Sequence, residues 1–242
     1  MNFDFSSEDR MIQEQVRRFL SEQSPLSRHR SIMEGESLQA SDVWQGLAEL
    51  GLQGTAIPEA FGGVGAGYLP LCLVAQELGG VLAAVPFSSS VYLATEAISC
   101  FGSADQKERY LPKLASGEWV GTLAVSEGPL APSPNNLTVA RSGDTISGKK
   151  LVVPHGLAAN FAVVLVKSGA GTDLVLAGLD GIERAAVEIV DPSIAAATID
   201  FAETPCESLG EPGDGWTMLD TLQHRAAVLY AFEQIGGAEQ AL

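Results

Sequence analysis

The hydrophobic periodicity of this chain changes at Trp119, and this change limits the folds that it can adopt. Before Trp119, apolar residues recur at the spacing of amphipathic helices, and Gly- and Pro-rich loops separate the segments. After it, short β-branched runs are bounded by Gly, Asp, Asn and Pro, which is typical of a small antiparallel barrel or sandwich. From Trp216 the period is helical again. The sequence therefore predicts an α+β multidomain chain: an N-terminal helical domain over 1–118, a middle β domain over 119–212, and the first helix of a C-terminal helical-bundle domain over 213–242.

Local signals predict where individual helices begin and end. Ser6 or Ser7 is the expected N-cap of the first helix, because acidic residues follow it in the first turn. Ser41 is the expected cap of the helix in "SDVWQGLAELG", and Gly51 its stop. Pro112 is expected to break the helix in "SADQKERYLPKLASGE". The last helix is so apolar that it requires a partner surface, which the chain itself need not supply.

Composition excludes several classes of function. Hydrophobic residues make up 46% of the 242 residues, which is enough for a sizeable core. The formal net charge of −16 repels phosphate backbones and anionic lipid, so we expect neither a nucleic-acid partner nor a membrane-surface role. The three cysteines are scattered and show no metal-ligand spacing, so neither a metal site nor a disulfide framework is expected. The N-terminus has no apolar signal segment, and the default expectation is a reduced cytoplasm.

Four blocks of sequence resemble one known family. "LAELGLQGTAIPEAFGGVGAG", "VAQELGG", "FGSADQKERYLPKLASGEWVGTLAVSE" and "LGEPGDGW" follow one another in the order and spacing of the acyl-CoA dehydrogenase family. The resemblance covers essentially the whole chain. It implies a helical domain, a β domain and a C-terminal four-helix domain, assembled as a homo- or hetero-oligomer. It also implies FAD as cofactor, an acyl-CoA substrate of fatty-acid or steroid type, and an electron-transfer partner that reoxidises the flavin.

The first flavin-facing motif of this family falls on "AVSEGPLAPS". The resemblance implies that Val125 and Ser126 contact the flavin ring, with the Ser126 hydroxyl and backbone N–H as donors. The Gly-Ser pair that follows in the family is replaced here by Ala131 and Pro132, with Ser133 beside them. Because proline has no N–H, this segment cannot hold an acyl-CoA or phosphate in the family's usual way. Ser133 is the residue of this segment that we expect to bind substrate.

The second motif of the family falls on "GKKLVVPHG". An aromatic residue that packs on the flavin and a Thr that bonds its reactive edge are typical of the family. Here these positions are Val152 and Pro154, so neither the ring nor the donor is present. Val152, Val153 and Pro154 could still pack on a flavin, as in remodelled steroid-side-chain relatives that work as unequal paired subunits. His155 is expected to be a turn histidine that touches solvent.

The catalytic base of the family lies in one of two places. One is far along the C-terminal domain, beyond Leu242. The other is just before an Arg in the first helix of that domain, where this chain has His224 and Arg225. Glu233, two turns further on, is a carboxylate in an otherwise apolar helix. Burial would raise its pKa, which suits a general base, so Glu233 is the catalytic candidate.

Three hypotheses follow. The first is an FAD-dependent acyl-CoA dehydrogenase that performs α,β-dehydrogenation of an acyl-CoA thioester, although catalysis by this chain alone is doubtful. The second is a non-catalytic, flavin-poor subunit that supports an active acyl-CoA dehydrogenase chain. The third, with less support, is an acyl-CoA oxidase or nitroalkane-oxidase-like activity on the same scaffold.

Overall fold

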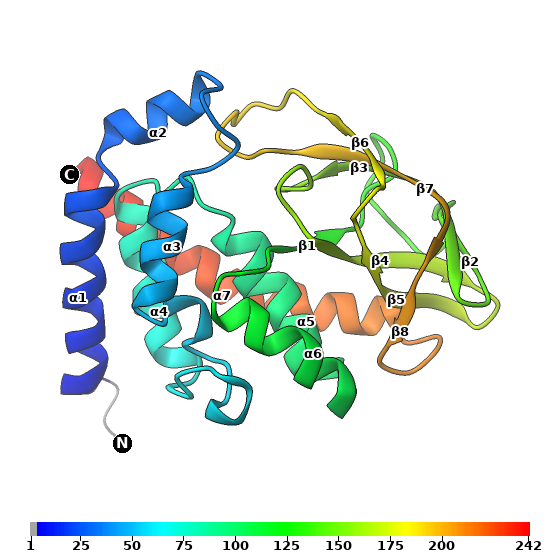
Figure 1. The fold of residues 1–242 in the computed structure, drawn as a ribbon, viewed down its shortest axis with the longest axis horizontal. Helices are drawn as coiled ribbons and strands as arrows, with labels where there is room; N and C mark the ends of the chain where they lie inside the picture. Colours follow the sequence, from blue (N-terminus) through cyan, green and yellow to red (C-terminus); the bar gives the residue numbers. More distant parts are fainter. Residues whose placement is uncertain (1–3) are drawn as a thin grey trace.

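A computed structural model describes residues 4–242, so the first three residues of the predicted helical domain lie outside the described part. The N-terminal part is a group of packed helices, and the second part is a β-sheet (Figure 1). The helical part consists of α1 (Ser7–Gln23), α2 (Leu26–Met33), α3 (Ser41–Glu49), η1 (Leu52–Gly54), η2 (Glu59–Phe61), α4 (Tyr68–Gly80), η3 (Ser88–Thr95), α5 (Glu96–Phe101) and α6 (Ala104–Ala115). The α+β fold class is therefore confirmed.

Side-chain caps fix two of these helices. Ser6 is the N-cap of α1 and forms a reciprocal capping box with Asp9, as the acidic first turn predicts. Ser103 and Gln106 form the same box at the start of α6. The predicted break at Pro112 is wrong, because α6 continues through that residue. Proline removes one backbone donor, but the buried face of α6 remains packed and holds the last turn in place.

The sheet consists of β1 (Gly121–Ala124), β2 (Ala140–Ser142), β3 (Thr145–Val153), β4 (Phe161–Ser168), β5 (Gly171–Gly178), β6 (Glu183–Ala186), β7 (Ala197–Pro205) and β8 (Glu207–Leu209). Its strand order is β6-β7-β3-β2-β4-β5-β8, and β1 pairs with β4 outside this path. The sheet is mixed rather than wholly antiparallel, because β1 and β2 both run parallel to β4. The first six residues of β4 are all buried, so this strand has core on both faces.

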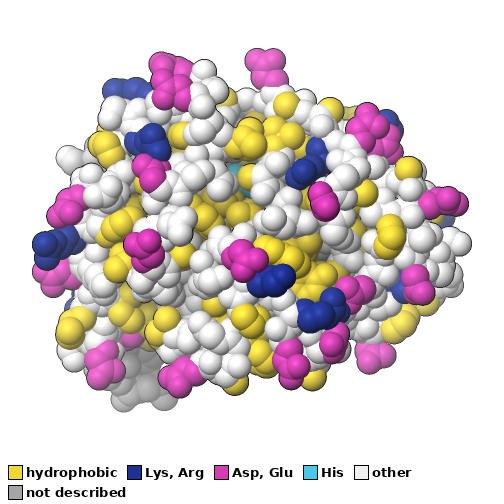
Figure 2. All heavy atoms as spheres, in the orientation of Figure 1, with side chains coloured by type: hydrophobic (Ala, Val, Ile, Leu, Met, Phe, Trp, Pro, Cys, Tyr) yellow, Lys and Arg dark blue, Asp and Glu magenta, His cyan; other side chains and the backbone are white. Residues whose placement is uncertain are grey.

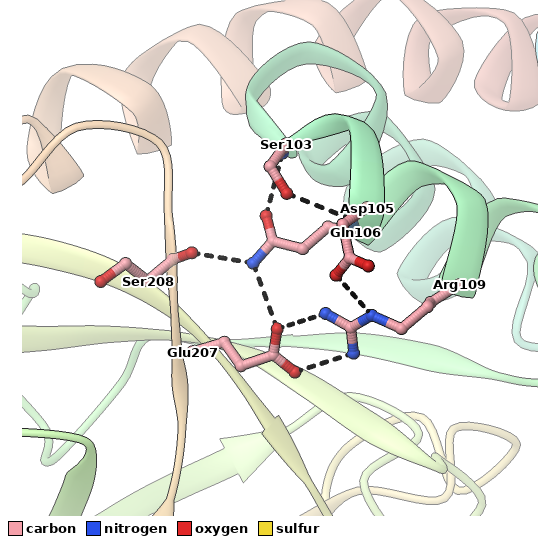
Figure 3. Close-up of polar contacts among 6 residues, drawn as sticks. All are labelled: Ser103, Asp105, Gln106, Arg109, Glu207 and Ser208. Atoms are coloured by element: carbon pink, nitrogen blue, oxygen red, sulfur yellow. Dashed lines mark hydrogen bonds and ion pairs between the residues drawn. The ribbon is translucent and has the colours of Figure 1, made fainter.

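The two parts of the chain are joined by polar contacts as well as by the core. Arg109 of α6 donates to both carboxylate oxygens of Glu207 in β8, at 3.0 and 2.5 Å, and also to Asp105 (Figure 3). Gln106 donates to the backbone carbonyl of Ser208 at 2.9 Å in the same cluster. These bonds hold α6 against one edge of the sheet.

The long helix α7 (Gly215–Ala241) begins beside the sheet and ends among the N-terminal helices (Figure 1). Its partner surface lies largely within this chain, since it crosses α4 closely and also packs on η3 and β5. Glycines permit this close crossing. A Cβ atom at Gly79 would lie 2.0 Å from the backbone carbonyl oxygen of Glu233, and a Cβ atom at Gly236 would lie 1.8 Å from the backbone carbonyl oxygen of Gln76. The close approach fixes where the second half of α7 lies relative to α4.

The predicted domain borders can be compared with these elements. The last helix of the first part ends at Ala115, the strands run from Gly121 to Leu209, and α7 begins at Gly215. The division into three domains stays a prediction.

Figure 2 shows apolar side chains gathered toward the middle of one face, with most acidic and basic side chains nearer its periphery. Within residues 4–242, no helix combines the length and apolar character needed to cross a membrane.

Candidate active site

A cavity of about 330 Å³ lies where the helical part meets the loops of the sheet. Its walls come from the end of α4, the segment leading into η3, the second half of α7, the turn after β3, and the segment between β6 and β7. Leu78, Val85, Phe87 and Ile194 make most of the lining apolar. Cavities that bind small molecules are typically of this size and character, at about 300–1,000 Å³. The cavity is therefore a candidate site for an apolar ligand.

Glu233 of α7 lines this cavity. The Tyr92 hydroxyl, which belongs to a fully buried side chain, donates to Glu233 Oε1 at 2.7 Å. Burial raises the pKa of Glu233 to about 7, and the Tyr92 hydrogen bond lowers it by less. A carboxyl group with a pKa near 7 can both accept and return a proton at neutral pH, which is what a general base requires.

Tyr92 is held in place by other aromatic rings. Its ring makes edge-to-face contacts with Phe87, at a centroid distance of 5.8 Å, and with Tyr230, at 5.6 Å. Tyr92 belongs to η3, whose wide turns have π-helical hydrogen bonding. Such segments are rare in proteins and are often found at functional sites.

His155 lines the same cavity and is 4% exposed, so the expectation of a solvent-facing turn histidine is wrong. Its Nδ1 atom lies 3.0 Å from the Ser89 hydroxyl of η3. Burial lowers the pKa of His155 to about 4, so the imidazole is neutral at physiological pH. The turn is covered by η3, which lies 66 residues away in sequence, and the local pattern contains no signal for that cover.

The backbone around His155 is strained. Val152 and His155 both have a φ of 52°, in the left-handed region that β-branched residues seldom occupy. The pairing of β3 with β7 is irregular between Lys150 and Val153, at the same place. Strain of this kind persists where the surrounding structure holds it, and it clusters at functional sites.

The two segments predicted to contact a flavin are neighbours. The Leu151 N–H at the end of β3 donates to the Ser126 carbonyl just after β1, at 2.8 Å. Val125 and Ser126 are partly buried, Val153 is buried, and Val152 is 45% exposed. Pro154 is exposed, and its carbonyl accepts from the Thr122 hydroxyl at 2.6 Å.

Other predicted residues lie elsewhere. Ser133 is in the loop after β1, where its N–H donates to the Asn136 side chain, and it does not line the cavity. His224 has a side chain that is 77% exposed and lies 3.3 Å from Asp220 on the same helix, away from the cavity. The structure thus brings Glu233 and His155 together and leaves Ser133 and His224 outside the group.

Comparison with known proteins supports one family. A family model described as acyl-CoA dehydrogenase, N-terminal domain, matches residues 6–118. Mitochondrial isovaleryl-CoA dehydrogenase of Bos taurus is 33% identical over 170 residues, which are 67% of this chain and 40% of that protein. A variant of the Tcur3481-Tcur3483 steroid ACAD has a TM-score of 0.83 and 29% identity, with 97% of this chain and 64% of that chain covered.

The chain belongs to the acyl-CoA dehydrogenase family. An acyl-CoA dehydrogenase of Bacillus anthracis complexed with FAD shows the same fold, with a TM-score of 0.86, 22% identity, and 98% of this chain and 44% of that chain covered. The chain spans about 40% of the length of the bovine relative.

Residues at the end of β1 fit the flavin of an acyl-CoA dehydrogenase. Within residues 4–242, neither the Ser126 N–H nor its hydroxyl has a hydrogen-bond partner. Two free donors on one partly buried residue suit the pyrimidine edge of a flavin, which becomes negative on reduction. The exposed Val152 side chain would give an apolar contact to a ring bound there. Pro154 supplies no donor, so the donor set is smaller than the family's.

A buried ion pair, which the sequence pattern did not predict, supports the segment after β1 in this acyl-CoA dehydrogenase family member. Lys150 is fully buried, and its Nζ donates to Glu127 Oε1 at 2.6 Å and to the Val125 carbonyl at 3.0 Å. Glu127 also accepts from the Thr138 hydroxyl at 2.6 Å. The signal that could have revealed it is a lysine in an apolar strand, 23 residues after a Glu that follows another strand. The pair holds the loop after β1 against β3.

Proposed function

We propose that this chain is part of an FAD-dependent acyl-CoA dehydrogenase, which removes an α proton and a β hydride from an acyl-CoA thioester to form an α,β double bond. The observation that supports this most is the placement of Glu233. A carboxyl with a pKa near 7 lines an apolar cavity whose lining also includes His155, the residue after the Val152–Pro154 segment that we propose to contact the flavin.

Each residue has a role in this proposal. Glu233 takes the α proton, and the Tyr92 hydrogen bond orients its carboxylate toward the cavity. The Ser126 N–H and hydroxyl bind the flavin, and Val125, Val152, Val153 and Pro154 pack against it. When FAD is bound it supplies the hydride acceptor. Ser133, in the loop after β1, stays a proposed contact for the substrate's CoA part.

The proposal extends to partners and location. An electron-transfer protein accepts the electrons, and the chain works in a homo- or hetero-oligomer. Oligomerisation suits the apolar side chains that α7 leaves exposed, among them Val228 and Ile235, each 46% exposed. A cytoplasmic location suits the three free cysteines, Cys72, Cys100 and Cys206.

Two observations favour a second candidate function. Pro154 lacks the hydroxyl and N–H that the family uses at the flavin's reactive edge, and His224, at the position of a family base, is turned to solvent. A chain with these features suits a non-catalytic subunit that supports an unequal, active acyl-CoA dehydrogenase chain. The Tcur3481-Tcur3483 steroid ACAD, which is similar to this chain, likewise carries two designations.

A visible absorption spectrum of the purified protein, with and without added FAD, separates the two candidates. We expect flavin bands that persist through gel filtration and bleach when an acyl-CoA is added anaerobically. Glu233→Gln should retain the flavin and lose the bleaching. Glu239→Gln changes an exposed carboxyl on the same helix and should behave like the native protein. A protein that takes up no FAD would refute the first candidate and favour the supporting subunit.

A further inference from the structure

The imidazole of His155 has one nitrogen whose partner is missing from the described part of the chain. Its side chain is 4% exposed, and it lines the 330 Å³ cavity. Nδ1 lies 3.0 Å from the Ser89 hydroxyl oxygen, whereas no described residue bonds to Nε2. Buried polar atoms in folded proteins are nearly always hydrogen-bonded. Nε2 is not among the fully enclosed unpartnered atoms of the described residues, so it is open to the cavity, where a ligand group can bond to it.

The hydrogen bonds of Ser89 determine which nitrogen carries the proton. Ser89 Oγ also lies 3.2 Å from the Pro86 carbonyl oxygen, which can only accept. We assign the single hydroxyl hydrogen of Ser89 to the Pro86 carbonyl, so that Ser89 accepts its second bond from His155 Nδ1–H. Because the ring is buried and neutral, Nε2 has a free lone pair and acts as an acceptor.

Other polar side chains line the cavity beside His155. The hydrogen of the Ser193 hydroxyl is donated to Asp191 at 2.6 Å. His29 Nδ1 lies 2.7 Å from the Leu82 carbonyl oxygen, which can only accept, so that nitrogen carries a proton. Ser88 and Gln234 in the same lining have donors as well, so the preference for one ligand group depends on His155 Nε2.

We propose that His155 is a specificity-determining residue that accepts a hydrogen bond from a hydroxyl group on the acyl part of the substrate. The identity of the ligand as an acyl group rests on the proposed function. The preference for a hydroxyl over a carbonyl rests on the hydrogen bonds of Ser89 and His155 alone. The substrate class is thus an apolar acyl-CoA with a hydroxyl group remote from the thioester.

The test compares decahydro-2-naphthol with decahydro-2-naphthalenone, which share one carbon skeleton and differ in the oxygen group. Both are titrated at pH 8, where Glu233 is ionised, into protein labelled with ¹⁵N in its histidines. We expect the ring spectrum of free His155 to show a protonated Nδ1 and an unprotonated Nε2. The alcohol should shift the Nε2 resonance and bind roughly three- to tenfold more tightly than the ketone, because one hydrogen bond is gained.

Variants give a second measure of the same preference. His155→Phe keeps a ring of similar shape and removes the acceptor, so the two probes should bind equally. His29→Phe makes the same change at another imidazole of the cavity and should leave the preference for the alcohol intact. If His155→Phe does not fold, the ring spectrum of the native protein still decides the proton's position.

Three results would overturn the inference: a protonated Nε2 in the free protein, equal binding of alcohol and ketone, or no binding of either probe by the folded protein. None of these measurements involves FAD or turnover. A colourless protein that prefers the alcohol would refute the proposed dehydrogenase and leave the hydroxyl site standing. A flavoprotein that an acyl-CoA reduces, but that binds the alcohol and the ketone equally, would support the proposed dehydrogenase and refute the hydroxyl site.

Discussion

Two adjacent glycines of α7 allow a sharp test of how the helices cross. A Cβ atom at Gly236 would lie 1.8 Å from the Gln76 carbonyl oxygen of α4, whereas one at Gly237 would have its nearest contact at 3.6 Å. Gly236→Ala forces the helices apart, and overpacking of this kind costs about 1–3 kcal/mol. Gly237→Ala fits and adds helix propensity, worth up to about 1 kcal/mol. The same chemical change one residue apart should therefore act in opposite directions.

Urea unfolding followed by far-ultraviolet circular dichroism measures both changes in the free energy of unfolding. We expect the midpoint to fall for Gly236→Ala and to stay or rise for Gly237→Ala. Because the crossing places Glu233 in the cavity, Gly236→Ala should also weaken any ligand binding there. Equal midpoints for the two variants would refute the described contact between α4 and α7.

Three further predictions concern the titratable groups. Tyr92→Phe removes a hydrogen bond to a carboxylate, which is worth about 1.5–3 kcal/mol. The pKa of Glu233, followed by ¹³C NMR titration, should therefore rise from about 7 to roughly 8–9. An unchanged pKa would contradict the contact between Tyr92 and Glu233. Burial raises the pKa of Glu233 above its ordinary value of 4.5. The contribution of the protonated Glu233 side chain to the free energy of unfolding is therefore fully present below pH 4.5 and is lost as the pH rises through 7. The difference in unfolding free energy between native protein and Glu233→Gln should therefore change by about 3 kcal/mol across this range, and parallel pH profiles would refute the burial. Lys150→Met leaves Glu127 without its cation and should lower the free energy of unfolding in urea by about 3–5 kcal/mol. The double variant Lys150→Met with Glu127→Gln should recover part of this loss. If Lys150→Met alone is as stable as the native protein, the pair is solvated.

Much of the architecture could be predicted from local pattern. The change of period at Trp119 precedes β1 by two residues, and the capping box at Ser6 marks the start of α1. These features depend on neighbours within a few residues, so one sequence is sufficient to recognise them. The helix α2 was missed because it is short and has no side-chain cap, and the parallel pairings with β4 join segments that are distant in the chain.

The candidate site divides in the same way. Glu233 could be selected from sequence because apolar residues flank it on both sides in α7, and the structure places it in a cavity. The burial of His155 could not be predicted, because η3, from 66 residues earlier, covers it. A lysine in an apolar strand signals a buried partner, but the local pattern of β3 does not identify Glu127 as that partner.

The sequence alone determined the family, the order of helices and strands, and the chemical groups available at each position, because these depend on residue type and near neighbours. Only the tertiary structure decided which of those groups lose contact with water. Desolvation is a property of what packs on a group, and the segments that pack on Glu233, His155 and Lys150 come from distant parts of the chain. The chemistry of the site therefore depends on the packing of α7, η3 and the β3 turn against one another.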